Sequence, residues 1–195
     1  MEATALLKAE HSSVKRMLAV LERVCGRIER GDRPATYDLE GIVEFLQVFA
    51  DRHHHGKEEG VLFPALVAAG LPRSVGPIPV LLAEHDEARA CVRGLAEGFR
   101  SFSAGGDGTR IVDDARAFIS LLILHIRKEE IVIFPIADER FNALRQGVLI
   151  EGFKRLAAGR LEEGAVHRFL RMLERLERAY PTAPALPLER TSGPA

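Results

Sequence analysis

One block of eleven residues occurs twice in the chain, and this repeat restricts where its polar core side chains lie. Residues 54–64 read HHGKEEGVLFP, and residues 125–135 read HIRKEEIVIFP, with seven identities at a separation of 71 positions. Both copies contain His-x-x-x-Glu, which in a helix places an imidazole and a carboxylate on one face, one turn apart. A shorter echo, Ala-Glu-His, ends at residue 11 and again at residue 85. The sequence therefore predicts two related halves, each with one histidine followed by a His-x-x-x-Glu pair.

Apolar residues recur at three- and four-residue steps along most of the chain, whereas strict alternation is rare. This period predicts long helices at about 7–30, 38–69, 79–103 and 109–135, and shorter ones at about 141–156 and 164–180. We therefore expect an all-α protein. Residues 1–140 form an up-down-up-down four-helix bundle, residues 141–181 are additional C-terminal helices packed on it, and the proline-rich residues 182–195 form a disordered tail.

Composition limits the partners of the chain. Its 195 residues, of which 47% are hydrophobic, suffice for one buried core. A net charge of -1 gives no electrostatic reason to expect nucleic acid or an anionic membrane. The first residues do not resemble a signal peptide, and no apolar run reaches the roughly 18–20 residues of a membrane span. We expect a cytoplasmic protein in which Cys25 and Cys91 are reduced thiols within helices.

Each of the four main helices interrupts its apolar stripe with a histidine, and two of them add a glutamate. An unpaired buried charge costs several kcal/mol, so an apolar core alone does not hold six such groups. Facing stripes of a four-helix bundle converge at matching depth, which is where bundles build metal sites. We therefore predict that a pair of cations is bound by six side chains: His11, His54, Glu58, His85, His125 and Glu129.

The donor types narrow the choice of metal. Four imidazoles and two carboxylates disfavour calcium and magnesium and favour iron, manganese or zinc. If both glutamates bridge two ions, each ion receives two nitrogens and two oxygens. That set satisfies zinc, but it leaves positions open on an octahedral ion such as iron. We expect two iron ions with an oxo or hydroxo bridge and an exchangeable position for dioxygen, peroxide or nitric oxide, with zinc or manganese as the alternatives.

At these residues the sequence resembles the hemerythrin-like, or HHE cation-binding, domain family. The six residues meet the family pattern of His, His-x-x-x-Glu, His and His-x-x-x-Glu on successive helices, and the Lys-Glu-Glu-x-x-x-Phe-Pro segments are similar to it as well. The resemblance covers about residues 1–140 and implies an up-down four-helix bundle with a non-haem di-iron centre. The oxygen-carrying hemerythrins use five histidines around an asymmetric pair of irons. The repeat here predicts four histidines in two symmetric halves, which argues against reversible oxygen carriage.

The residues that flank the predicted ligands leave several roles open. His55 lies about 100° round the helix from His54, and is a fifth ligand, a group behind a ligand, or a surface residue. His53 is expected outside the centre. Glu59 and Glu130 either face solvent or accept a hydrogen bond from a ligating imidazole. His167 lies off the apolar stripe of its helix and is expected to be exposed.

Three functions fit this pattern. The favoured one is a di-iron protein that binds, senses or reacts with a small ligand, and a sensor docks to a partner protein or a second copy through its C-terminal helices. The second is a di-iron peroxidase, catalase-like or nitric-oxide-reducing enzyme, which needs a proton donor; Tyr37 and His55 are the candidates. The third is a metal store or a structural zinc-binding bundle.

Overall fold

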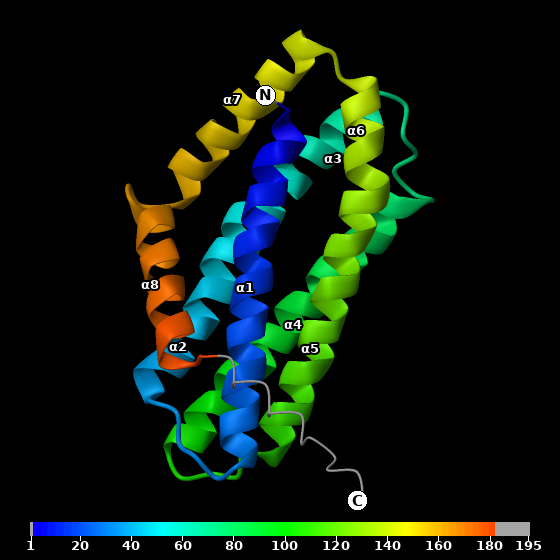
Figure 1. The fold of residues 1–195 in the computed structure, drawn as a ribbon. Helices are drawn as coiled ribbons and strands as arrows, with labels where there is room; N and C mark the ends of the chain where they lie inside the picture. Colours follow the sequence, from blue (N-terminus) through cyan, green and yellow to red (C-terminus); the bar gives the residue numbers. More distant parts are fainter. Residues whose placement is uncertain (1, 182–195) are drawn as a thin grey trace, which may run out of the picture.

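Four long helical segments run up and down beside one another in the computed structural model, which describes residues 2–181 (Figure 1). The first is α1, Ala3–Glu29, and the third is α4, Pro77–Ser103. The second joins α2 (Thr36–Glu44), η1 (Phe45–His55), η2 (Glu58–Leu62) and α3 (Phe63–Ala68). The fourth joins α5 (Thr109–Lys128), η3 (Glu129–Ile133) and α6 (Phe134–Arg140). The predicted all-α bundle is confirmed.

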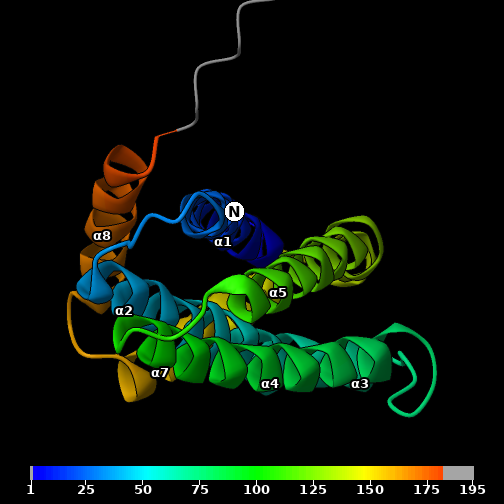
Figure 2. The same cartoon turned by 90° about the horizontal axis from the view of Figure 1, so that it is seen from below.

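Two further helices follow the bundle, α7 (Ala143–Arg160) and α8 (Ala165–Ala179). α7 buries Leu149 and Phe153, and α8 buries Phe169, Leu173 and Leu176. α8 lies against α1 and η1, on the side of the bundle away from α5 (Figure 2). The helices α7 and α8 thus cover the outer side of the first and second long segments. The predicted tail, 182–195, lies outside the described residues.

The segments η1, η2 and η3 are π-helical, so their turns are wider than those of an α-helix. η2 begins at Glu58 and η3 begins at Glu129, the repeat-related carboxylates. Each is followed by a Phe-Pro pair that opens α3 or α6, where the missing proline N–H leaves no bond unmade. Pro64 and Pro135 therefore restart their helices. The period of the sequence did not reveal the π-helical turns.

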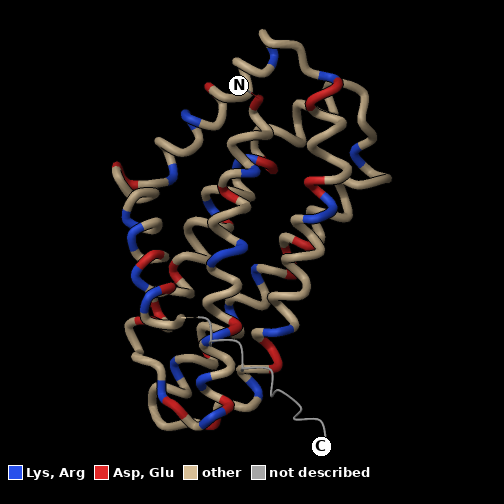
Figure 3. The backbone as a smooth tube through the Cα atoms, viewed as in Figure 1, with Lys and Arg blue, Asp and Glu red and all other residues tan. Residues whose placement is uncertain are grey.

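The hydrophobic core has two parts that lie on either side of the predicted ligands along the bundle. The larger part includes Leu21, Phe45 and Phe118, and the smaller includes Leu66 and Phe134. Across the described residues, the helices lack a stretch long and apolar enough to cross a membrane. Basic and acidic residues are interspersed along the described helices (Figure 3). Burial of apolar side chains therefore does not explain why histidine and glutamate side chains form a layer between the two parts of the core.

Candidate metal centre

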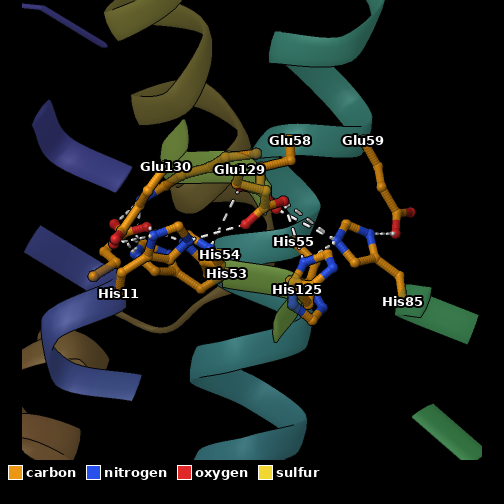
Figure 4. A network of polar contacts seen from close by, with 12 residues as sticks. His11, His53, His54, His55, Glu58, Glu59, His85, His125, Glu129 and Glu130 are labelled. Atoms are coloured by element: carbon orange, nitrogen blue, oxygen red, sulfur yellow. Dashed lines mark hydrogen bonds and ion pairs between the residues drawn. The ribbon is translucent and has the colours of Figure 1, made fainter. Parts of the chain in front are cut away.

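The structure brings all six predicted ligands together in the middle of the bundle (Figure 4). Each of the four long segments contributes, and all six side chains are at most 1% exposed. Together with His55 they form two groups, and within each group the potential ligand atoms lie within 4.8 Å of one another. The first group is His11, His54, Glu58 and Glu129, and the second is His55, Glu58, His85 and His125.

The two carboxylates extend from one group to the other. One oxygen of Glu129 lies 3.1 Å from Nε2 of His11, and the other lies 3.2 Å from Nε2 of His125. The oxygens of Glu58 lie 3.5 Å from Nε2 of His54 and 3.5 Å from Nε2 of His85. Each carboxylate thus has one oxygen facing each group, which is the arrangement required to bridge two cations.

Most of the buried polar atoms without a hydrogen bond lie at this centre. Among the described residues they include Nε2 of His11, Nε2 of His54 and both oxygens of Glu58 and Glu129. A buried polar atom left unpaired costs about 1–3 kcal/mol, so six in one place oppose folding strongly. Cations would satisfy all six at once, because imidazole nitrogens and carboxylate oxygens are suitable ligands for transition metals. The residues present therefore fit a pair of metal ions.

Two of the imidazoles are held by a carboxylate from their own half of the chain. Nδ1 of His54 donates to Glu10 at 3.0 Å, and Nδ1 of His125 donates to Glu84 at 3.0 Å. Glu10 and Glu84 directly precede His11 and His85 in the short echo, so they occupy related positions. Sequence reasoning missed both, although the repeated Glu-His pair was a signal. With Nδ1 protonated, each ring turns its Nε2 lone pair towards the centre.

The other two imidazoles are held by the opposite half. Nδ1 of His11 donates to Glu130 at 3.0 Å, and Nδ1 of His85 donates to Glu59 at 2.7 Å. Of the two roles left open for Glu59 and Glu130, the structure shows contact with an imidazole. The four buttressing carboxylates each contact a basic residue as well: Glu10 contacts Lys57, Glu84 contacts Lys128, Glu130 contacts Lys15 and Glu59 contacts Arg89.

Two phenylalanines of the repeated block close the centre at one end. The ring of Phe134 stacks on His11 with centroids 5.3 Å apart, and the ring of Phe63 stacks on His85 at 6.0 Å. Both rings are nearly fully buried. Each ring also restricts the orientation of the imidazole on which it stacks. The phenylalanines of the Phe-Pro pairs therefore pack around the centre, while the prolines restart the helices.

Burial and neighbouring side chains shift the pKa values of the carboxyl and imidazole groups at the centre. Burial, together with the charge of Glu129, raises the pKa of Glu58 well above its ordinary value. Burial acts on Glu129 too, but neighbouring imidazoles outweigh it and hold the pKa of Glu129 well below its ordinary value. Burial lowers the pKa of His54 to about 4. Without cations the protonated form of Glu58 is therefore favoured beside an ionised Glu129, and His54 is a neutral imidazole with a free lone pair at neutral pH.

His55 breaks the expected symmetry of the two halves. It is 4% exposed, and its ring stacks on that of His85 with centroids 3.9 Å apart. Its Nδ1 lies 3.6 Å from Asp51. The repeat-related residue is Ile126, which is buried and carries no donor. The second group therefore contains three imidazoles and the first contains two, so the prediction of two symmetric halves fails at this position.

The other candidates lie away from the two groups. His53 is buried, but its Nε2 is 3.1 Å from Glu10 rather than at the centre. Tyr37 is 63% exposed at the start of α2, seventeen residues and roughly 25 Å of helix before His54. It is therefore no proton donor for this centre. His167 is exposed, as predicted.

Glu84→Gln will weaken metal binding without removing a ligand. The neutral amide no longer offers His125 a charged acceptor, so the imidazole loses its fixed orientation and part of its basicity. We expect affinity for iron to fall by about 10- to 100-fold. Competition with a calibrated chelator measures the change. Glu87→Gln, one turn further along α4 and exposed, is the matched control. Equal affinities in the two variants would contradict the buttressing role.

Comparison with known proteins agrees with this centre. A family model described as the hemerythrin HHE cation binding domain matches residues 2–137. Uncharacterized proteins of Mycobacterium bovis and of two strains of Mycobacterium tuberculosis are 23% identical to the chain over 150 residues. That match covers 76% of this chain and 58% of each relative, so the chain spans a little over half their length. No solved structure matches significantly. The matched region contains all the candidate ligands described above, and the chain belongs to the hemerythrin HHE cation-binding family.

Proposed function

We propose that the chain binds two iron ions and uses them to bind, sense or react with a small ligand such as dioxygen, peroxide or nitric oxide. The observation that carries this proposal is the pair of donor groups spanned by Glu58 and Glu129. The donors are imidazoles and carboxylates, and neither Cys25 nor Cys91 is among them. Such a donor set favours iron over calcium, magnesium or copper(I).

The number of donors leaves room for a ligand. Five imidazoles, counting His55, and two bridging carboxylates supply nine bonds, whereas two six-coordinate ions accept twelve. If an oxo or hydroxo group bridged the ions, it would use two of the remaining positions and would leave one for an exchangeable ligand. Zinc is satisfied by fewer ligands, so a structural zinc-binding or storage role would leave the fifth imidazole without a purpose.

Within this proposal the chain's own residues have three tasks. The buttressing carboxylates fix the imidazoles, so that all lone pairs point to one place before a cation arrives. Phe63 and Phe134 exclude water from one end. When bound, the iron pair supplies the redox change and the position at which a small molecule is held. Glu58 releases its proton when the cations bind, because a bridging carboxylate is ionised.

Metal analysis combined with ligand addition tests the proposal. We expect about two irons per chain, near-ultraviolet absorption from the oxidised pair, and a spectral change when nitric oxide or dioxygen is added to the reduced protein. Continuous consumption of peroxide or nitric oxide would identify an enzyme instead. A zinc-filled protein without absorption would identify a structural or storage bundle. An iron-loaded protein that responds to none of these ligands would contradict the proposal.

His55→Ile will make the two iron sites alike. The substitution places in the first half the residue that the second half already has, Ile126, and removes the one imidazole that distinguishes the groups. Mössbauer spectra of the iron-loaded parent should show two quadrupole doublets, and spectra of the variant should approach one. The control is His53→Leu, which copies Leu124 in the same way at a residue outside both groups and should keep two doublets. Two unchanged doublets in His55→Ile would exclude His55 as a ligand.

A protein partner fits the sensing form of this proposal. Leu144 and Val148 are large apolar side chains exposed on α7, and they offer a docking surface on the C-terminal helices. Such a partner would respond to a change at the iron pair that is transmitted through α7, because α7 packs on η2, the segment that begins at Glu58. Capture of a partner that depends on Leu144 would support this surface.

A further inference from the structure

The outer face of α5 and η3 exposes large apolar side chains. Leu124 is 55% exposed and Ile131 is 63% exposed, and Ile123 and Val132 flank them. α5 lies at the edge of the molecule opposite α7 and α8 (Figure 1). Exposed apolar side chains that cluster on one helix face, in contrast to single ones, mark an interaction surface.

The internal repeat shows that this face is covered in the other half of the chain. At a separation of 71 residues, Phe49, His53, Gly56 and Gly60 correspond to Ser120, Leu124, Arg127 and Ile131. The first set lies under the C-terminal helices. The ring of Phe49 contacts that of Phe169 at 6.3 Å, and a Cβ added at Gly60 would lie 2.7 Å from Leu156. The repeat thus pairs a face that α7 and α8 cover with one that no described segment covers.

The uncovered face has the spacing of a helix that packs on another helix. Ala117 and Leu124 lie seven residues apart on one exposed line of α5, and the exposed apolar side chain of Ile131 follows in η3. Asp113, Ser120 and Arg127 form a second line beside the first, which is polar and exposed. An apolar line flanked by charged residues is the pattern of a helix–helix seam. The seam is long, because it follows α5 and continues into η3.

The distribution of charge along this seam favours a second copy of the chain as the partner and determines whether the two helices run parallel or antiparallel. Asp113 and Asp114 lie near the start of α5, whereas Arg127 and Lys128 lie at its end. When two such helices run antiparallel with their midpoint at residue 120, Asp113 of each copy lies opposite Arg127 of the other, because both residues are on the second line. Ala117 and Leu124, both on the first line, then come close across the pair, so a small side chain meets a large one. A parallel pairing would instead place like charges opposite each other.

We propose that two copies of the chain associate antiparallel through α5, with Asp113 of each copy opposite Arg127 of the other. Because this surface is self-complementary, it closes a symmetric pair. The second copy covers the α5–η3 face, as α7 covers the related face on η1 and η2 within one copy. The inference rests on the surface of α5 and is independent of which ligand the metal centre takes.

A charge swap tests the pairing. Sedimentation velocity on the full, iron-loaded chain should show a dimer. Asp113→Arg and Arg127→Asp each place like charges opposite each other twice, and we expect each to weaken association by at least about tenfold. The double variant restores both pairs in reversed order and should recover association. Neither residue makes a hydrogen bond or ion pair within its own copy among the described residues, so the fold should tolerate both changes.

Two further variants locate the interface. Ala117→Glu puts a charge against Leu124 of the second copy, eight residues from His125, and should dissociate the dimer while metal content stays at the parental value. Leu144→Glu alters the exposed start of α7 and should leave the dimer intact. A monomeric parent, single charge variants that associate normally, a double variant without recovery, or a dimer lost only in Leu144→Glu would each overturn the proposal.

Discussion

His54→Ala and His125→Ala will each strip metal from the protein and lower its thermal stability. Both imidazoles point Nε2 at the shared carboxylates, and both are at most 1% exposed. Without one of them the nearest cation loses a nitrogen donor, and Glu58 and Glu129 stay buried without compensation. Since metal binding contributes directly to folding, we expect the unfolding free energy of the loaded protein to fall by about 3–5 kcal/mol.

Elemental analysis and thermal unfolding of the purified variants measure both effects. His167→Ala is the matched control, because it removes an imidazole that is exposed on α8. The control should keep the metal content and melting temperature of the parent. Full metal content in both His54→Ala and His125→Ala would refute their assignment as ligands.

Glu58→Gln will lower the stability of the metal-loaded protein and raise the stability of the metal-free protein. Glutamine is a poor bridge between cations, so the loaded variant should lose most of its metal and several kcal/mol of stability. In the metal-free protein, the same change removes a carboxyl group that is fully buried with both oxygens unpaired. At neutral pH the buried Glu58 must retain a proton that the unfolded chain releases, whereas a neutral amide has no such cost. We therefore expect the metal-free variant to be the more stable by about 1–4 kcal/mol.

The pH dependence of this difference follows from the raised pKa of Glu58. Its folded pKa lies above the ordinary value of 4.5, so its protonated form is favoured by folding. The stability that Glu58 contributes is complete below pH 4.5 and is lost as pH rises through the folded value. Glutamine does not titrate, so the advantage of the metal-free variant should grow with pH. A metal-free variant less stable than the parent at every pH would exclude a costly buried carboxylate.

The clustering of the six predicted ligand residues could be foreseen because the repeat marks them in both halves. A single His-x-x-x-Glu motif fits an exposed pair on a solvated helix as well as a ligand pair. Two copies at related positions, each inside an apolar stripe, fit only a shared buried site. The bundle followed from the same period, since four amphipathic helices bury their stripes against one another.

The role of His55 could not be predicted from the sequence, because it depends on which other elements pack around η1. Three consecutive histidines span about 200° of a helix, so on an ordinary surface helix at least one faces solvent. Here all three are buried. The C-terminal helices cover the side of His53, and His55 stacks on His85 of α4. Tertiary packing, which is not local in sequence, decides which of the three reaches the centre.

The buttressing carboxylates show the same limit. Which glutamate supports which imidazole depends on how the two halves meet, and the contact between His11 and Glu130 spans 119 residues. The basic partners repeat as well, since Lys15 and Arg89 occupy related positions. A repeat predicts that both halves use the same residues. It does not predict that Glu59 and Glu130 act on the opposite half.

This exchange between halves determines when the protein can acquire its ions. Neither half contains a complete set of oriented donors, because His11 awaits a carboxylate from α5–η3 and His85 awaits one from η2. An emerging polypeptide must be made past residue 130 before any high-affinity site exists. Ion capture is therefore expected to be a late event in biogenesis, and partly synthesised or truncated chains should compete poorly for metal ions in the cell.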